Sequence, residues 1–165
     1  MRKLLFVLLF IVACSTPPIS APVELEEYDG YVNEQFHFRN QILSGFDVLE
    51  GESGIFMSKP SQYLDNPGKK DEEIISYRIE IVVEAQEVQY LNLADFLMKE
   101  YDGYSVEYLD DGVIVDEWMD DDSVRHFYTM RGDVLYDAYF RLPSVRFNNH
   151  LSGFDAFLET LEFDF

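Results

Sequence analysis

Few side chains in this 165-residue chain stand in a pattern that could do chemistry. Ser53 lies between nearby glycines at residues 51–54, but neither the glycine spacing nor the expected strand–turn–helix context fits a hydrolase nucleophile turn. His37, His126 and His150 are far apart and lack the spacing of metal ligands on one helix or strand face. The sequence has no glycine-rich phosphate loop. We therefore predict that the protein is not an enzyme and needs no metal or organic cofactor.

Acidic side chains are the most abundant chemical groups, with 32 Asp and Glu against 12 Lys and Arg. Several of them crowd two predicted turns and the segment between these turns. Calcium takes several oxygen ligands, but the order here does not match the Asp-x-Asp-x-Asp-Gly loop that typically holds it. A calcium or small-ligand site stays open as an alternative to ordinary turn chemistry. The crowded acids are Asp110, Asp111, Asp116, Glu117, Asp120, Asp121 and Asp122.

The net charge of −20 limits the possible partners. Nucleic acid is excluded, because binding to phosphates needs clustered Lys and Arg. The folded part is also not expected to lie on anionic lipid. One remaining interpretation is solubility through self-repulsion, and the other is attraction of a basic protein partner or a divalent cation.

The first fourteen residues have the pattern of an export signal. Arg2 and Lys3 precede an apolar run over residues 4–12, and small Ala13 comes directly before Cys14, the only cysteine. The run is shorter than the roughly 20 apolar residues that a membrane span needs. The segment resembles the lipobox of bacterial lipoproteins. This resemblance implies that residues 1–13 are removed, that Cys14 carries a diacylglycerol, and that its new N-terminus carries an acyl chain such as palmitate.

A lipid on Cys14 predicts an anchored protein of the cell envelope. Ser15 resembles residues that permit sorting to the outer membrane, on its periplasmic face, in hosts with two membranes. Residues 14–30 are proline-rich and then acidic, which predicts a flexible tether. Residues 31–165 then form a single globular domain, which has no second cysteine and therefore depends on burial for stability.

The pattern of this domain predicts an α+β fold. Apolar residues alternate over residues 74–85 as in a half-buried strand, and four shorter runs between Asp- and Gly-rich turns predict an antiparallel meander. Helical spacing appears over residues 92–101, with Asn92 as N-cap, and again over 148–161. Residues 36–41, 48–49 and 55–57 predict short strands, and 59–70 a loop. The meander runs are 104–109, 113–119, 124–130 and 134–142.

The layout resembles the superfamily of PsbP, Mog and DcrB-like proteins. The similar segments are Phe36-His37-Phe38, residues 74–85, residues 93–97, the Arg-His-Phe-Tyr stretch at 125–128, and the aromatic C-terminal segment at 154–163. The resemblance implies an antiparallel β-sheet flanked by two main α-helices, as an α/β/α sandwich. It also implies a binding or assembly role, with no catalytic residue to carry over.

Aromatic residues gather in the second half of the chain, where they fit either the core and cross-strand pairs or a docking face. Trp118 beside Met119, within the acidic stretch, is the best candidate for partner contact. We expect a non-enzymatic envelope lipoprotein that is held on the membrane by its lipid anchor and binds or scaffolds an envelope protein. The alternatives are an inhibitor or immunity lipoprotein against a basic toxin, or a lipoprotein that binds calcium or a small ligand.

Overall fold

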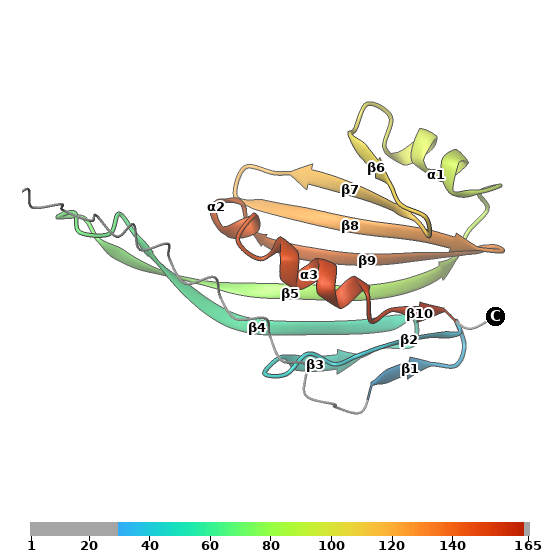
Figure 1. The fold of residues 1–165 in the computed structure, drawn as a ribbon, viewed down its shortest axis with the longest axis horizontal. Helices are drawn as coiled ribbons and strands as arrows, with labels where there is room; N and C mark the ends of the chain where they lie inside the picture. The colour runs from blue at the N-terminus through green and yellow to red at the C-terminus, as the bar shows by residue number, and fades with distance from the viewer. Residues whose placement is uncertain (1–29, 164–165) are drawn as a thin grey trace, which may run out of the picture.

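A seven-stranded antiparallel sheet organises the protein, in the order β3-β4-β5-β9-β8-β7-β6 (Figure 1). The computed structural model describes residues 30–163, so the predicted signal peptide and all of the tether except Gly30 lie outside the described residues. The strands are β3 (Asp47–Glu50), β4 (Gly54–Asp65), β5 (Glu73–Glu87), β6 (Val106–Tyr108), β7 (Val113–Trp118), β8 (Asp122–Arg131) and β9 (Val134–Pro143).

A second, three-stranded sheet brings the two ends of the domain together. It contains β1 (Tyr31–Asn33), β2 (Phe38–Asn40) and β10 (Glu162–Phe163), in the order β1-β2-β10. Arg39 on β2 forms an ion pair with Glu162 on β10. The Tyr136 hydroxyl of the large sheet donates a hydrogen bond of 2.6 Å to the Phe36 carbonyl. The sequence did not predict this second sheet, because strands of two or three residues are too short to show a period.

Two helices cover one face of the large sheet. They are α2 (Ser144–Phe147) and α3 (Leu151–Leu158), and their aromatic side chains enter the larger apolar core. Phe154 stacks on Phe140 of β9, with ring centroids 5.3 Å apart and planes 12° apart. The residues that alternate along β5 meet the same core, as their period of two predicted.

The opposite face carries one helix, α1 (Leu93–Glu100), which buries Phe96 and Leu97 in a smaller core with Val113 and Val115. Asn92 is its N-cap, and its side-chain oxygen accepts a hydrogen bond of 3.0 Å from the Asp95 amide. The helix predicted over residues 92–101 is therefore confirmed. Within residues 30–163 no helix has the length and apolarity needed to cross a membrane.

The predicted loop over residues 59–70 is wrong. Strand β4 continues to Asp65, where it pairs with Glu73, and the turn occupies only the residues between them. The long apolar alternation of β5 provides the pairing partner, and Leu64 faces Ile74 across the ladder. Residues 59–65 and 73–79 form a two-stranded ribbon that projects beyond the body of the domain (Figure 1). We call this ribbon the β4–β5 arm.

The C-terminal helix is shorter than the predicted 148–161 span. It covers Leu151–Leu158, and the separate short helix α2 precedes it. Phe163 lies in β10 and packs on Tyr136, with ring centroids 4.7 Å apart. The predicted antiparallel meander is confirmed in all four strands, β6 to β9. The described chain is therefore mostly antiparallel sheet with three short helices.

Replacement of Phe154 by Ala should remove the ring that joins α3 to the sheet. Phe154 is 1% exposed, and we expect a loss of about 3–5 kcal/mol in the free energy of unfolding, measured by urea denaturation. Val145→Ala, at a side chain 70% exposed, is the control and should change that free energy by less than about 0.5 kcal/mol. Equal effects of the two changes would contradict the assignment of the core.

Candidate functional site

Trp118 and Met119 lie where β7 ends, and both are exposed, Trp118 by 60% and Met119 by 48%. The Trp118 ring also packs edge-on against buried Phe147 of α2, with centroids 5.3 Å apart. One side of the indole is thus held by the core, whereas the rest faces solvent. A large aromatic side chain that is both anchored and exposed has the properties of an interface residue.

A shallow groove extends along the edge of the sheet from Trp118. Its first part has a volume of about 560 Å³ and is lined by the loop before β6 and by β7. Its second part, of about 420 Å³, continues to α3 and shares Glu107 and Ile114 with the first. We call the two parts the β6 groove. Its lining residues are Asp102, Gly103, Tyr104, Ser105, Glu107, Leu109, Asp110, Asp111, Ile114, Asp116, Trp118, Arg125, Phe127, Asp155, Leu158 and Glu159.

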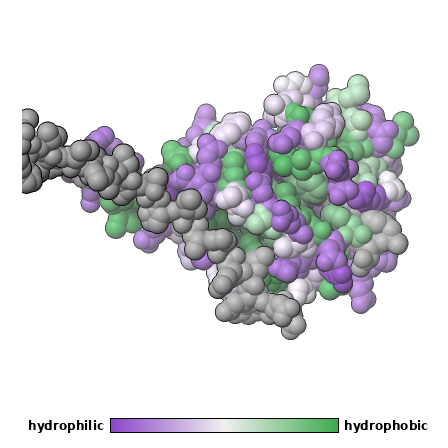
Figure 2. Space-filling model, viewed as in Figure 1, coloured by the Kyte–Doolittle hydropathy of each residue, from purple (hydrophilic) through white to green (hydrophobic). Residues whose placement is uncertain are grey.

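The lining of the β6 groove is strongly acidic. Seven of its residues are Asp or Glu, and Arg125 is the only cation among them. Arg125 is already neutralised, since it makes hydrogen bonds of 2.8 and 2.9 Å to Asp116 and lies 3.4 Å from Asp155. The hydrogen bonds that Arg125 donates to Asp116 raise the pKa of Arg125, so this cation keeps its charge. The groove therefore presents an excess of negative charge over an apolar floor that includes Ile114 and Phe127. Figure 2 shows hydrophilic and hydrophobic residues interspersed over the face of the domain that it views.

The two acidic turns do not meet. Asp110 and Asp111 precede β7 and Asp120 to Asp122 follow it, so the six-residue strand separates them by about 20 Å. Within residues 30–163, no group of three or more His, Cys, Asp or Glu side chains is placed to hold a metal ion. The second turn contacts the start of α2. The Asp121 carbonyl accepts a hydrogen bond of 2.9 Å from the amide of Ser144, the first residue of that helix.

A partly buried polar network lies on the α1 face of the sheet. His126 Nδ1 lies 2.9 and 3.1 Å from the Asp137 carboxylate, and the Tyr128 hydroxyl lies 3.0 Å from the same nitrogen. Tyr101, the C-cap of α1, hydrogen-bonds to Tyr128. Burial raises the pKa of Tyr101 and Tyr128, so both hydroxyls keep their protons at neutral pH. Burial also raises the pKa of Asp137, although its hydrogen bond with His126 opposes this.

This network ties α1 to the sheet. A histidine oriented by an aspartate could assist a nucleophile, but the other His126 nitrogen, Nε2, lies 3.9 Å from the Glu117 carboxylate. Among the described residues, no serine, threonine or cysteine forms a hydrogen bond with His126. Its geometry therefore supports a role in positioning α1.

The sequence contains a signal that could have predicted this network. The tight turn at Gly132 and Asp133 pairs Arg131 with Val134, and this register places Tyr128 opposite Asp137. His126 is two residues from Tyr128, so it lies on the same face of the sheet. A histidine, a tyrosine and an aspartate on one strongly apolar face indicate a buried polar cluster.

The remaining candidates for chemistry are separate from one another. His37 is exposed in the turn before β2, and His150 lies directly before α3. Ser53 lies directly before β4, and its carbonyl accepts a hydrogen bond of 2.8 Å from the Ala85 amide. The neighbouring Gly54 is required sterically, because a Cβ there would lie 2.0 Å from the Val83 carbonyl oxygen. The glycines around Ser53 therefore serve strand packing.

The sequence matches no protein-family model and no curated protein. Among solved structures, the fold is similar to that of cyanobacterial PsbP (CyanoP) from Synechocystis sp. PCC 6803. The TM-score is 0.51, with 11% identity, covering 82% of this chain and 92% of that one. The chain has a PsbP-like fold.

A Bacteroides thetaiotaomicron VPI-5482 protein, known from a crystal structure at 1.50 Å resolution, is also similar to this chain. Its TM-score is 0.52, with 14% identity, covering 82% of this chain. The chain spans about half the length of that protein, 48%. At such low identities, the likeness to PsbP and to the Bacteroides protein concerns the fold alone.

Tyr128→Phe should loosen α1 by removing the hydroxyl that joins His126 and Tyr101. We expect a loss of about 0.5–1.5 kcal/mol in unfolding free energy and faster amide exchange in Leu93–Glu100, measured by hydrogen–deuterium exchange. Tyr108→Phe is the matched control, because that side chain is 74% exposed. Unchanged exchange in α1 would show that the network does not hold the helix.

Proposed function

We propose that this protein is a lipid-anchored lipoprotein of the cell envelope, without catalytic activity, that docks a basic segment of a protein partner in the β6 groove. The observation that carries the proposal is the combination of seven acidic residues, one neutralised arginine and an exposed but anchored tryptophan around one groove. An apolar floor with an acidic rim favours a partner whose Lys or Arg side chains flank apolar ones.

The edge of the sheet supports an extended partner segment. Within residues 30–163, strand β6 pairs only with β7, so its outer edge has backbone groups available for a further strand. Tyr108 and Leu109 are exposed at this edge. A partner strand added to β6 would place alternate side chains toward Glu107 and the groove.

The acidic charge would act mainly on the rate of association. Charges arranged around a site raise the association rate of an oppositely charged partner, and salt weakens this effect. The same property supports a sharper form of the proposal, in which the protein is an inhibitor or immunity lipoprotein that neutralises a basic toxin. The genomic neighbourhood and the salt dependence of binding would separate a toxin from a resident envelope partner.

The anchor in this proposal is Cys14. Removal of residues 1–13 and lipidation of Cys14 would leave a proline-rich tether up to the start of the domain. Ser15 supports the periplasmic face of the outer membrane as the location in a host with two membranes. The tether would allow an acidic domain to stay away from anionic lipid.

For the fold, we infer a reduced form of the α/β/α sandwich. The support is that α1 packs on one face of the large sheet and α2 and α3 on the other. The helices are short, with eight residues in α1 and eight in α3, so they cover only part of each face.

Cys14→Ala should abolish lipidation and release the protein from the membrane. Several acyl chains contribute about 0.8 kcal/mol for each buried methylene, so their loss should shift the protein to the soluble fraction. Fractionation and mass spectrometry of the N-terminus check this. Membrane partitioning that does not change in the variant would contradict the anchor.

Photo-crosslinking in cells tests the docking surface. A photoreactive amino acid in place of Leu109 should trap one dominant basic protein, because this 43% exposed residue lines the β6 groove. The same amino acid in place of Leu49, which is 69% exposed on β3 at the opposite edge, is the control and should not trap it. Equal trapping at both edges, an acidic partner or no partner would overturn the proposed function.

Trp118→Ala should weaken binding of the trapped partner more than it weakens folding. We expect an affinity loss of roughly tenfold or more, as for an aromatic hot spot, and a loss of unfolding free energy below about 1 kcal/mol. Calorimetric binding and urea denaturation measure the two effects. A large stability loss with unchanged affinity would make Trp118 a core residue only.

A further inference from the structure

Arg146 differs from every other arginine in residues 30–163. The other five each have a carboxylate within 4.0 Å, as expected in a chain with a net charge of −20. Among the residues that the structure describes, the Arg146 side chain has no partner for an ion pair or a hydrogen bond. The five pairs are Arg39–Glu162, Arg78–Asp47, Arg125–Asp116, Arg131–Asp111 and Arg141–Asp122.

Arg146 is held by an aromatic contact, but its buried Nε–H has no hydrogen-bond acceptor among the described residues. Its guanidinium carbon lies 5.5 Å from the centre of the Tyr63 ring, in a cation–π contact with the β4–β5 arm. Its Nε is buried and lacks a hydrogen-bond partner. A buried donor without an acceptor costs free energy, so its presence requires an explanation.

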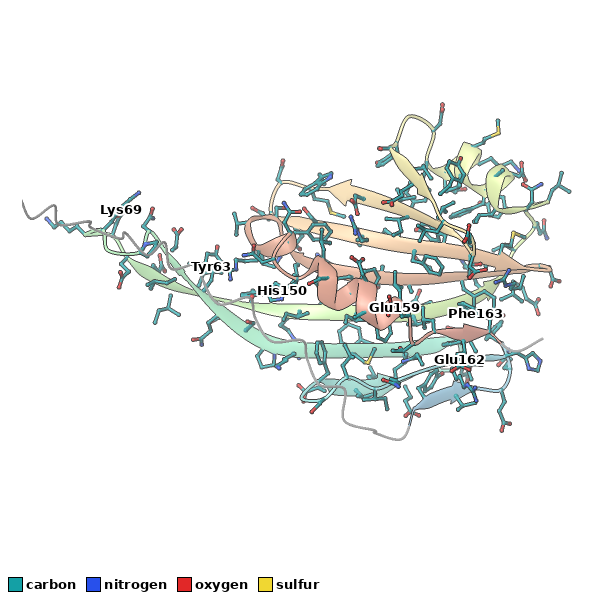
Figure 3. All side chains as sticks on the ribbon, viewed as in Figure 1. Tyr63, Lys69, His150, Glu159, Glu162 and Phe163 are labelled. Atoms are coloured by element: carbon teal, nitrogen blue, oxygen red, sulfur yellow. The ribbon has the colours of Figure 1, made fainter. Side chains whose placement is uncertain are left out.

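Two further polar side chains, joined by a hydrogen bond, lie near Arg146. The Tyr77 hydroxyl on β5 lies 3.3 Å from Nε2 of His150, and the rings of Tyr63 and Tyr77 are 5.9 Å apart. All four side chains are partly buried. Figure 3 shows Tyr63 on the arm and His150 at the side of the body from which the arm projects. The group contains a guanidinium, an imidazole and two phenols, and it contains no carboxylate.

We propose that Arg146, Tyr63, Tyr77 and His150 form a binding site for an oxyanion, the carboxylate or phosphate group of a ligand. A planar guanidinium can give two parallel hydrogen bonds to either group, and the hydroxyls add neutral donors. This site lies on the arm side of the molecule and is independent of the β6 groove. Failure of either proposal therefore leaves the other standing.

The site predicts a coupling between anion binding and protonation of His150. Burial and the nearby Arg146 charge lower the pKa of His150. The neighbours of the imidazole are Tyr77 on β5 and Arg146 on α2, and a bound anion would oppose the effect of Arg146. Anion binding should therefore raise the pKa of His150, and affinity should increase as pH falls through the range in which His150 gains its proton.

Phosphate and acetate titrations of the full-length protein test the site, with sodium chloride at matched ionic strength as the control. NMR of the His150 ring follows both binding and the His150 pKa. We expect saturable shifts with phosphate or acetate, which identify the favoured oxyanion, and a higher His150 pKa in the saturated protein. Shifts that sodium chloride reproduces, or a His150 pKa that does not rise at saturation, would overturn the site.

Variants locate the binding. Arg146→Gln should lower affinity about tenfold or more, since it removes a charged donor, and Arg146→Lys should retain part of it. Arg39→Gln, which removes an arginine that pairs with Glu162, should bind like the unchanged protein. Tyr77→Phe removes one hydroxyl without changing charge, and it should weaken binding even if Arg146→Gln fails to fold. Equal affinity in Arg146→Gln, or in Tyr77→Phe where Arg146→Gln does not fold, would contradict the proposal.

Discussion

The ladder between β8 and β9 is the interaction on which the rest of the domain depends. Ten residue pairs, from Asp122 with Pro143 to Arg131 with Val134, join these strands around a tight turn. Gly132 has a φ of +60°, a conformation that L side chains rarely adopt. This turn fixes the register, and a shift by one residue would move every side chain to the other face of the sheet.

That register determines which side chains lie on each face of the sheet. Phe127, Ala138 and Phe140 point to the larger core, where α3 covers them. Their neighbours His126, Tyr128 and Asp137 point the other way and form the network that holds α1. Arg125 lies on the α3 face and orders the acidic lining by pairing with Asp116 and Asp155. The β6 groove is thus a consequence of strand register at the edge of the sheet.

Local patterns in the sequence predicted the elements that have a strong period or cap. These elements are the strand β5, from its alternation, the helix α1, from its N-cap Asn92, and the meander, from its Asp- and Gly-rich turns. The sequence does not predict the β4–β5 arm, because strand β4, with Lys59-Pro60 at its centre, lacks a clear period and depends on pairing with β5. Trp118 was proposed for its type and acidic setting, whereas the groove beside it depends on α3, distant in sequence. The sequence could not single out Arg146, because its difference from the other arginines lies in their ion pairs, which depend on the fold.

Chemical-shift mapping with a synthetic octalysine peptide tests most directly whether the β6 groove is the preferred site for a basic chain. We expect the shifts of the labelled protein to cluster at residues 104–118 and 155–159 and to weaken as salt increases. Shifts spread evenly over all acidic surfaces, or concentrated on the β4–β5 arm, would contradict it.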